Sequence, residues 1–422
     1  MDATGHIEDL GSFISAAPSS YHAAAEVARR LGTAGYAPLD EAADWRDAVR
    51  PGARLVVVRD GAVIALALPS EAGPGTPFRI LGAHTDSPGF KLKPRPAFGS
   101  NGWLQAAVEV YGGPIIPSWF DRELEFAGRL VTQHGTTHLV RTGPFARIPH
   151  LAIHLDRDLN TSFAPDRQRD VQPIFGVEGP DVLTHLARAA GVEAGEIAGF
   201  DIITADSAAP ARFGAGKSLF AAGRMDNLTS VHAGVVALAD AAPGDAIAVL
   251  AAFDHEEIGS ESRSGAGGPF LADVLERVTA ALGGDRGDLV RAYARSWFLS
   301  ADAGHAVHPN RPDRHDPTHR PVAGGGPLLK INANQRYTTD AIGAALWART
   351  CAKAGVPFQE FVSNNVVPCG STIGPISSAR LGIPTLDVGT PLLSMHSARE
   401  LAHVDDPGRL AAAAAVFFTG LP

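Results

Sequence analysis

The chain is 422 residues long, with 45% hydrophobic and 19% charged residues, which is typical of a globular protein and too long for one hydrophobic core. Its net charge of −9 argues against nucleic acid or an anionic membrane as the main partner, since both require a basic face. The two cysteines, Cys351 and Cys369, exclude a disulfide framework and a thiolate zinc cluster and fit a reducing compartment.

The first part of the chain predicts a few helix and strand elements. Apolar spacing favours a helix, a hairpin that turns at Asp60 and Gly61, and a buried strand, at residues 21–31, 55–68 and 78–83 respectively. Between about residues 88 and 211 the pattern changes to short strand-like pieces separated by glycine and proline. We expect residues 88–211 to form a second, β-rich domain inserted into the first.

From residue 218 onwards, helical and strand patterns alternate. The expected elements lie near residues 230–241, 246–253, 271–282, 297–301, 340–354, 383–388 and 409–418. This alternation is typical of a sheet with helices on both faces. We therefore predict an α/β protein, whose first domain consists of residues 1–87 and 212–422.

The most informative motif is the segment 254–258, Asp-His-Glu-Glu-Ile, which directly follows the apolar run 246–253. Two adjacent glutamates at the end of a buried strand are costly unless a cation or a proton transfer uses them. One carboxylate could hold a metal while its neighbour takes a proton from metal-bound water. Glu256 and Glu257 therefore indicate a metal site.

Other potential ligands follow short apolar segments or lie between small residues. They are His84, Asp86, Asp226, Asp302 and His396. In open α/β sheets, ligands bind in the loops at the carboxyl ends of strands, so these side chains could meet there. The insertion would explain how His84, before it, reaches the carboxylates that come after it.

Each of these residues also has an ordinary structural interpretation. Adjacent glutamates are common on protein surfaces. Asp302 could form a turn before Gly304. Asp226 could cap a helix, although Asn227 is the better capping candidate and would leave Asp226 free to bind a metal.

Eight motifs, taken together and in chain order, resemble the M18 family of metallopeptidases, the aspartyl aminopeptidases. They lie at residues 84–93, 118–122, 148–155, 224–227, 254–262, 300–310, 368–375 and 394–397. The resemblance implies a dinuclear zinc aminopeptidase that removes N-terminal Asp or Glu from peptides. It also implies a catalytic α/β/α sandwich with a mixed sheet, interrupted by a β-rich dimerisation domain, and a homododecamer built from dimers.

The resemblance also implies a role for each motif residue. The metal ligands would be His84, Asp226, Glu257, Asp302 and His396, with Asp226 bridging two zinc ions in each subunit. Glu256 would be the general base, Asp86 would orient His84, and His154 would be lent to the active site of a neighbouring subunit. Carboxylate-rich sites also accept Mn or Co.

The substrate pocket is less well defined by the sequence. We expect Lys330 to face an acidic substrate side chain, because it lies in an apolar strand-like stretch where a lone ammonium needs an anion. His305 and His308 are expected to shape the same pocket. Two segments depart from the family pattern, Asn334 and residues 364–366, Asn-Asn-Val. A lysine at a strand end that reaches solvent is the structural alternative for Lys330.

Two other functions stay open. The altered segment 364–366 is compatible with a broad or neutral-residue metalloaminopeptidase, and a large oligomer could be a catalytically silent scaffold. Residues 1–8 show no basic region followed by an apolar stretch, and the longest apolar run, 410–418, is nine residues. A membrane span needs roughly 20. We expect a cytoplasmic protein with no membrane partner.

Overall fold

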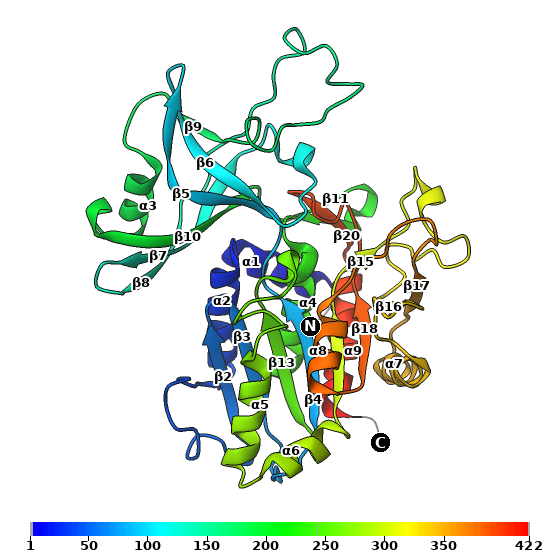
Figure 1. Cartoon of the computed structure of the whole chain (residues 1–422). Coiled ribbons are helices and arrows are strands. Elements are labelled where there is room, and N and C mark those ends of the chain that lie inside the picture. The colour runs from blue at the N-terminus through cyan, green and yellow to red at the C-terminus, as the bar shows by residue number, and fades with distance from the viewer. Residues whose placement is uncertain (1–2, 243, 421–422) are drawn as a thin grey trace.

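The computed structural model describes residues 3–242 and 244–420 (Figure 1). The α-helices in these residues are α1 (Ala3–Ala16), α2 (Ser20–Thr33), α3 (Val182–Ala190), α4 (Met225–Ala239), α5 (Phe270–Ala281), α6 (Arg286–Tyr293), α7 (Ala341–Ala354), α8 (Ile373–Leu381) and α9 (Asp406–Thr419). None of them has both the length and the apolar character that crossing a bilayer requires.

A nine-stranded mixed sheet forms the centre of the larger body. In spatial order its strands are β1 (Ala37–Pro38), β2 (Arg54–Arg59), β3 (Ala62–Ala67), β13 (Ile247–Phe253), β4 (Phe78–His84), β14 (Trp297–Ala301), β18 (Thr385–Gly389), β16 (Leu328–Ile331) and β17 (Gln359–Val362). The four neighbours β13, β4, β14 and β18 are mutually parallel, so their carboxyl ends meet at one edge.

Helices cover both faces of this sheet. Along β13, Ala248 and Leu250 pack into one core with α1, α2, α4, α7 and α9. Val249 and Ala251 pack into the other core with α5, α6 and α8. Because successive side chains of a strand point to opposite faces, a strand buried on both sides is apolar throughout. The architecture is an α/β/α sandwich, and the predicted α/β fold class is confirmed.

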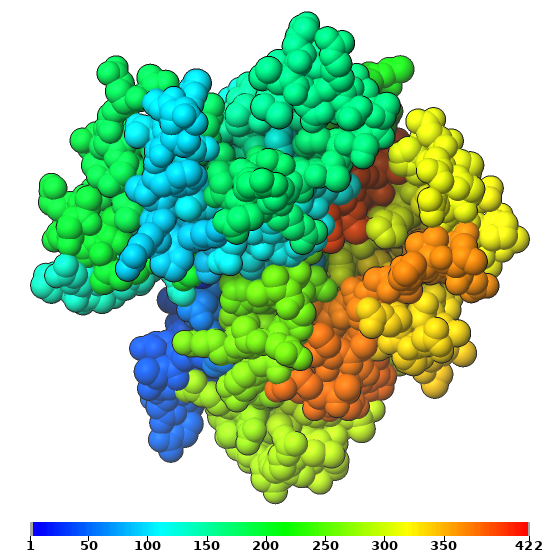
Figure 2. Space-filling model, turned by 45° about the horizontal axis from the view of Figure 1, so that its top comes forward, coloured from blue at the N-terminus to red at the C-terminus, as the bar shows by residue number. Residues whose placement is uncertain are grey.

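A second, six-stranded sheet forms the separate lobe at the top of Figure 1. Its strands are, in spatial order, β8 (Thr137–Arg141), β7 (Leu124–Thr132), β10 (Ile197–Asp206), β5 (Gly89–Ser100), β6 (Trp103–Tyr111) and β9 (Ile174–Gly176). We call residues 89–206 the inserted region, because they lie in sequence between β4 and the rest of the larger body. Figure 2 shows this region, cyan to green, seated over one end of that body. The sheet lies within the predicted span 88–211, whose limits stay a prediction.

A small third sheet joins the two parts. It contains β11 (Ala211–Phe213), β12 (Leu219–Ala222), β20 (Glu400–His403), β19 (Pro391–Leu393) and β15 (Gly304–His305). Its strands come from the beginning, the middle and the end of the second half of the chain. It therefore brings the segment between β19 and β20, which contains His396, to the edge where α4 begins.

The predicted helices in the second half lie close to the observed ones, but one detail was wrong. Helix α4 begins five residues earlier than residue 230, and its buried face extends around most of the helix, so it shows little amphipathic spacing. Asp226 and Asn227 have non-helical backbone angles, and the Asn227 side chain does not cap the helix. Its amide donates to the carbonyl of Ala301 at 2.8 Å, and its Oδ1 has no hydrogen-bond partner among the described residues. Asn227 instead ties the first turn of α4 to the end of β14.

Candidate metal centre

The parallel strands β4, β13 and β14 bring three potential ligands to one edge of the sheet. Phe253 of β13 lies in register with His84 of β4, so the segment that follows Phe253 begins beside that histidine. Ser300 of β14 pairs with Gly82 of β4, which places Asp302 just beyond the same edge. His84, Glu257 and Asp302 therefore converge as the sequence predicted.

Asp226 and His396 reach the same place from the first turn of α4 and from the segment between β19 and β20. The carboxylate of Glu400 accepts hydrogen bonds from the backbone N–H groups of both residues. The Asp226 N–H donates to Glu400 Oε2 at 3.0 Å and the His396 N–H donates to Glu400 Oε1 at 2.8 Å. Glu400 is buried, and burial, with the nearby Asp226 carboxylate, raises its pKa to about 8.

The converging side chains form two groups that share Asp226. One group is His84, Asp226 and Asp302, and the other is Asp226, Glu257 and His396; within each group the ligand atoms lie within 4.8 Å of one another. His84 Nε2 is 3.3 Å from Asp226 Oδ1, and His396 Nε2 is 3.4 Å from Asp226 Oδ2. The two oxygens of Asp226 thus face two different histidines.

Some of the buried carboxylate oxygens in these groups lack a hydrogen-bond partner, whose place a bound cation could take. Asp226 is 3% exposed, and its Oδ1 has no hydrogen-bond partner among the described residues; the same is true of Glu257 Oε1. Buried carboxylate oxygens without a partner are costly, and a bound cation removes that cost. Imidazole nitrogens and carboxylate oxygens are ordinary zinc ligands. The residues present therefore fit a metal.

The two histidines are held in charged form by the carboxylates around them. Burial lowers the pKa of His84, but contacts with Asp226, Asp302 and Asp86 outweigh it and raise that pKa well above its usual value. Burial also lowers the pKa of His396, and Asp226 and Glu257 outweigh it and raise the value to about 10. A metal ion must displace these protons, so its binding weakens as the pH falls.

Glu256 is half-buried beside the same carboxylates. Burial raises its pKa to about 8, and the charges of Asp302, Asp86 and Asp226 add to the effect of burial while His84 opposes it. Glu256 also forms a third group with His84 and Glu257. A carboxylate that holds a proton near neutral pH is suited to general acid and base chemistry.

Asp86, which was predicted to orient His84, also contacts the glutamate pair. His84 Nδ1 donates to the main-chain carbonyl of Asp86 at 3.0 Å, whereas the Asp86 carboxylate is 3.5 Å from that nitrogen. The carboxylate instead accepts the N–H groups of Glu256 and Glu257 at 3.0 and 3.1 Å. Asp86 thus orients the imidazole through its backbone and the glutamate pair through its side chain.

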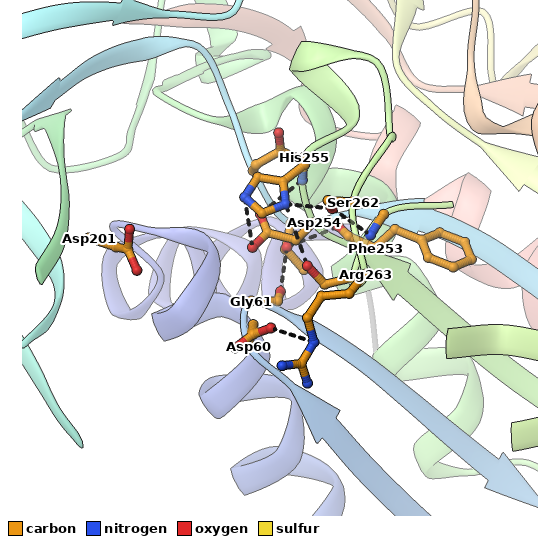
Figure 3. Close-up of polar contacts among 12 residues, drawn as sticks. Asp60, Gly61, Asp201, Phe253, Asp254, His255, Ser262 and Arg263 are labelled. Carbon is orange, nitrogen blue, oxygen red and sulfur yellow. Dashed lines mark hydrogen bonds and ion pairs between the residues drawn. The ribbon is translucent and has the colours of Figure 1, made fainter. Parts of the chain in front are cut away.

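The turn that carries the glutamate pair is held from its other side by His255, which has a left-handed backbone with a φ of 64°. Figure 3 shows His255 pointing toward Ser262, whose Oγ lies 2.8 Å from His255 Nδ1. The N–H of His255 donates to Asp254 Oδ1 at 2.9 Å, and the N–H of Asp254 donates to the carbonyl of Ser264 at 3.1 Å. These bonds close the loop behind Glu256.

Other predicted residues lie outside the metal groups. His154 is exposed on a loop of the inserted region and lines no part of the cluster in its own chain. His305 and His308 lie after Asp302 on the exposed side of the site. Lys330 is 2% exposed; its Nζ donates to the carbonyl of Ala303 at 2.7 Å and lies 5.3 Å from the ring centroid of Tyr337.

Two groups that hold the site were missed from the sequence. Glu400 lies four residues after His396, just outside the motif at 394–397, and a buried-carboxylate pattern there could have indicated it. Tyr111, whose hydroxyl donates to Asp86 Oδ2 at 2.8 Å, lies at the end of β6 and carries no sequence signal. Such a contact between distant segments depends on the tertiary structure.

A buried cluster of histidines and carboxylates at the carboxyl edge of parallel strands, with a free glutamate beside it, defines a metal-dependent hydrolase. Residues 13–418 match the family described as aminopeptidase I zinc metalloprotease (M18). The chain belongs to the M18 family and is a metalloaminopeptidase, as the eight motifs predicted.

Relatives of known name or structure agree with this assignment. The probable M18 family aminopeptidase 2 of Streptomyces avermitilis is 53% identical over 426 residues, covering 99% of this chain and 98% of the relative. A chain in the cryo-EM structure of the Ape4 and Nbr1 complex has a TM-score of 0.96 at 34% identity, covering 99% of this chain and 86% of that one. A chain of the S. cerevisiae mApe1 dodecamer has a TM-score of 0.86 at 28% identity, covering 98% of this chain and 96% of that one.

Proposed function

We propose that this metalloaminopeptidase binds two zinc ions per subunit and removes N-terminal Asp or Glu from peptides. The observation that carries the proposal is the pair of donor groups that share Asp226. A carboxylate whose two oxygens face two different histidines is suited to bridging two ions. His84 and Asp302 would complete one position, and Glu257 and His396 the other. Mn or Co could occupy the same donors.

The residues around the cluster would divide the chemistry between them. Bound zinc supplies Lewis acidity toward the scissile carbonyl and lowers the pKa of a water molecule. Glu256 accepts the proton of the attacking water and returns it to the leaving amine. Asp86 holds Glu256 and Glu257 through their N–H groups, so the base and the adjacent ligand keep one relative position.

Lys330 supports the preference for acidic residues. Its buried ammonium group forms no ion pair with the described residues, and it donates a hydrogen bond to the main-chain carbonyl of Ala303, next to Asp302. A buried cation without an anion is costly, and the side chain of an N-terminal Asp or Glu would provide one. His305 and His308 would line the opening to this position.

The departure at residues 364–366 has a structural use. The Asn364 side chain donates to the carbonyls of Asp313 and His315 at 3.3 and 3.1 Å, which fastens the long loop 310–326. Val366 is 87% exposed. This segment therefore fastens a loop without adding a charge, and Lys330 stays the candidate for binding the substrate side chain.

The test is hydrolysis of peptides with N-terminal Asp, Glu, Leu and Ala, with chelator and after re-addition of zinc. We expect chelator-sensitive release of Asp and Glu, and Lys330→Ala should lower kcat/KM for them by about 10- to 100-fold more than for Leu. Lys353→Ala, which removes an ammonium that also donates to a main-chain carbonyl far from the site, is the matched control.

The results with the four peptides distinguish between the candidate functions. A preference for Leu or Ala keeps the metal chemistry and favours a neutral-residue aminopeptidase. An equal loss on all substrates assigns Lys330 to structure. No release with any metal favours the silent scaffold.

We further propose a homo-oligomer, a dodecamer built from dimers, in which the inserted region is the dimer surface and peptides are the substrates. The loop that contains His154 exposes three apolar side chains, Leu151, Ile153 and Leu155, at 59%, 43% and 76%. Exposed apolar side chains in one segment are typical of an interaction surface. The similarity to the mApe1 dodecamer supports the same assembly. The two free cysteines support a cytoplasmic location.

If His154 completes a neighbouring site, two inactive variants should complement each other. We expect His154→Phe and Glu256→Gln to be inactive separately, and mixed oligomers of the two to regain up to about a quarter of wild-type activity, because some sites combine an intact His154 with an intact Glu256. His134→Phe, an exposed histidine of the same region, serves as the control and should stay active. Mixed oligomers without activity would contradict sharing between subunits.

A further inference from the structure

The inserted region touches the metal centre of its own chain through the short segment 111–118, which follows β6. Tyr111 reaches Asp86, with its hydroxyl donating to Oδ2 at 2.8 Å. The same Asp86 carboxylate accepts the N–H groups of Glu256 and Glu257. Tyr111 therefore contacts the residue that holds the turn carrying the general base and one proposed ligand.

The same segment sets the orientation of His396. The carbonyl of Gly113 lies 3.0 Å from His396 Nδ1. Because a carbonyl oxygen only accepts, Nδ1 must carry a proton, and the proton that a metal ion would displace is the one on Nε2. That nitrogen lies 3.4 Å from both Asp226 Oδ2 and Glu257 Oε2, so it faces the position of the metal.

Two further bonds hold the backbone around His396. The N–H of Ile115 donates to the His396 carbonyl at 2.9 Å, and the N–H of Ala398 donates to Ser118 Oγ at 2.9 Å. Gly112 packs closely as well: a Cβ at that position would lie 3.2 Å from the Cβ of Glu257. The segment therefore fits against both ends of the second donor group.

We propose that the segment 111–118 positions the second metal site, with Tyr111 acting on Glu256 and Glu257 through Asp86, and Gly113 acting on His396. This inference rests on the proposed function. It means that the inserted region does more than present an interaction surface. The contacts of this one segment therefore reach both the glutamate pair, through Asp86, and His396.

Tyr111→Phe tests the proposal, because it removes one hydroxyl and leaves the ring. We expect zinc affinity, measured by chelator competition without substrate, to fall by about 10-fold. We also expect kcat to fall by about 10-fold while KM changes by less than about twofold, since the variant displaces the base and not the substrate pocket. Tyr36→Phe is the matched control: it loses a buried hydroxyl bond of 2.7 Å to the Leu238 carbonyl, away from the cluster, and should leave both quantities unchanged.

A double-mutant cycle with Asp86→Asn distinguishes action through Asp86 from a general loss of stability. We expect Tyr111→Phe to have little further effect on zinc affinity in the Asp86→Asn background, because the contact is already altered there. Additive losses, or a Tyr111→Phe protein with wild-type zinc affinity and kcat, would overturn the proposal. If wild-type protein itself binds no zinc, the proposed function has failed instead.

Ser118→Ala tests the His396 end of the segment independently. We expect a loss of zinc affinity confined to the site formed by Asp226, Glu257 and His396, with the oligomeric state of the protein unchanged. Unchanged zinc affinity at that site would restrict the positioning role to Tyr111 and overturn the assignment of the whole segment.

Discussion

We expect the replacement of Glu256 with glutamine to lower kcat by on the order of 10³-fold and to leave the zinc content unchanged. The amide keeps the shape of the side chain but cannot accept the proton of the attacking water. Because the N–H of Glu256, which donates to Asp86 Oδ1 at 3.0 Å, is retained, the turn keeps its position. The measurement is kcat on an Asp-peptide together with metal analysis of the same sample.

Glu261→Gln is the control for that result, because Glu261 is an exposed glutamate that follows the same turn. It should show wild-type turnover. A Glu256→Gln enzyme with wild-type turnover would remove Glu256 as the base, and one that had lost its zinc would make it a ligand instead.

We expect the replacement of Asp226 with alanine to abolish tight zinc binding at both proposed positions, and with it all measurable hydrolysis. Asp226 is the residue that belongs to both donor groups, so its loss leaves each group with one carboxylate and one histidine. Asp302→Ala, which affects only one group, should retain about one equivalent of zinc per subunit. The measurement is zinc stoichiometry after gel filtration, alongside thermal unfolding to show that both variants fold.

Retention of one tightly bound zinc in Asp226→Ala would contradict the bridging role. Equal stoichiometry in the two variants would show that the groups do not act as separate sites. Both outcomes leave the family assignment intact, because that assignment rests on the match over residues 13–418.

The predicted strands agree with the observed ones because their signal is local. The run 246–253 is apolar throughout, which is typical of a strand buried on both faces, and β13 lies there with every residue buried. Several helices were harder to predict from the sequence. The first helix, α1, and the short α3, α6 and α8 were not predicted, since tertiary packing and capping decide their limits more than periodicity does.

The chemistry of the site follows largely from residue types and their order. Histidines and carboxylates after short apolar runs indicated a metal centre, and the structure brings all five proposed ligands into two groups that share Asp226. The roles of Lys330 and His154 stay predictions, because each depends on something that one chain does not contain: a substrate or a neighbouring subunit.

By itself, the sequence determined the family and the fold class and indicated candidate metal ligands, because these depend on local patterns and motif order. Only the tertiary structure decided how they are held. It placed both N–H groups of the glutamate pair on Asp86, two ligand backbones on Glu400, and Gly113 on His396. These bonds join segments far apart in the chain, so local sequence patterns do not reveal them. The bond to Gly113 also requires the inserted region to pack against the larger body.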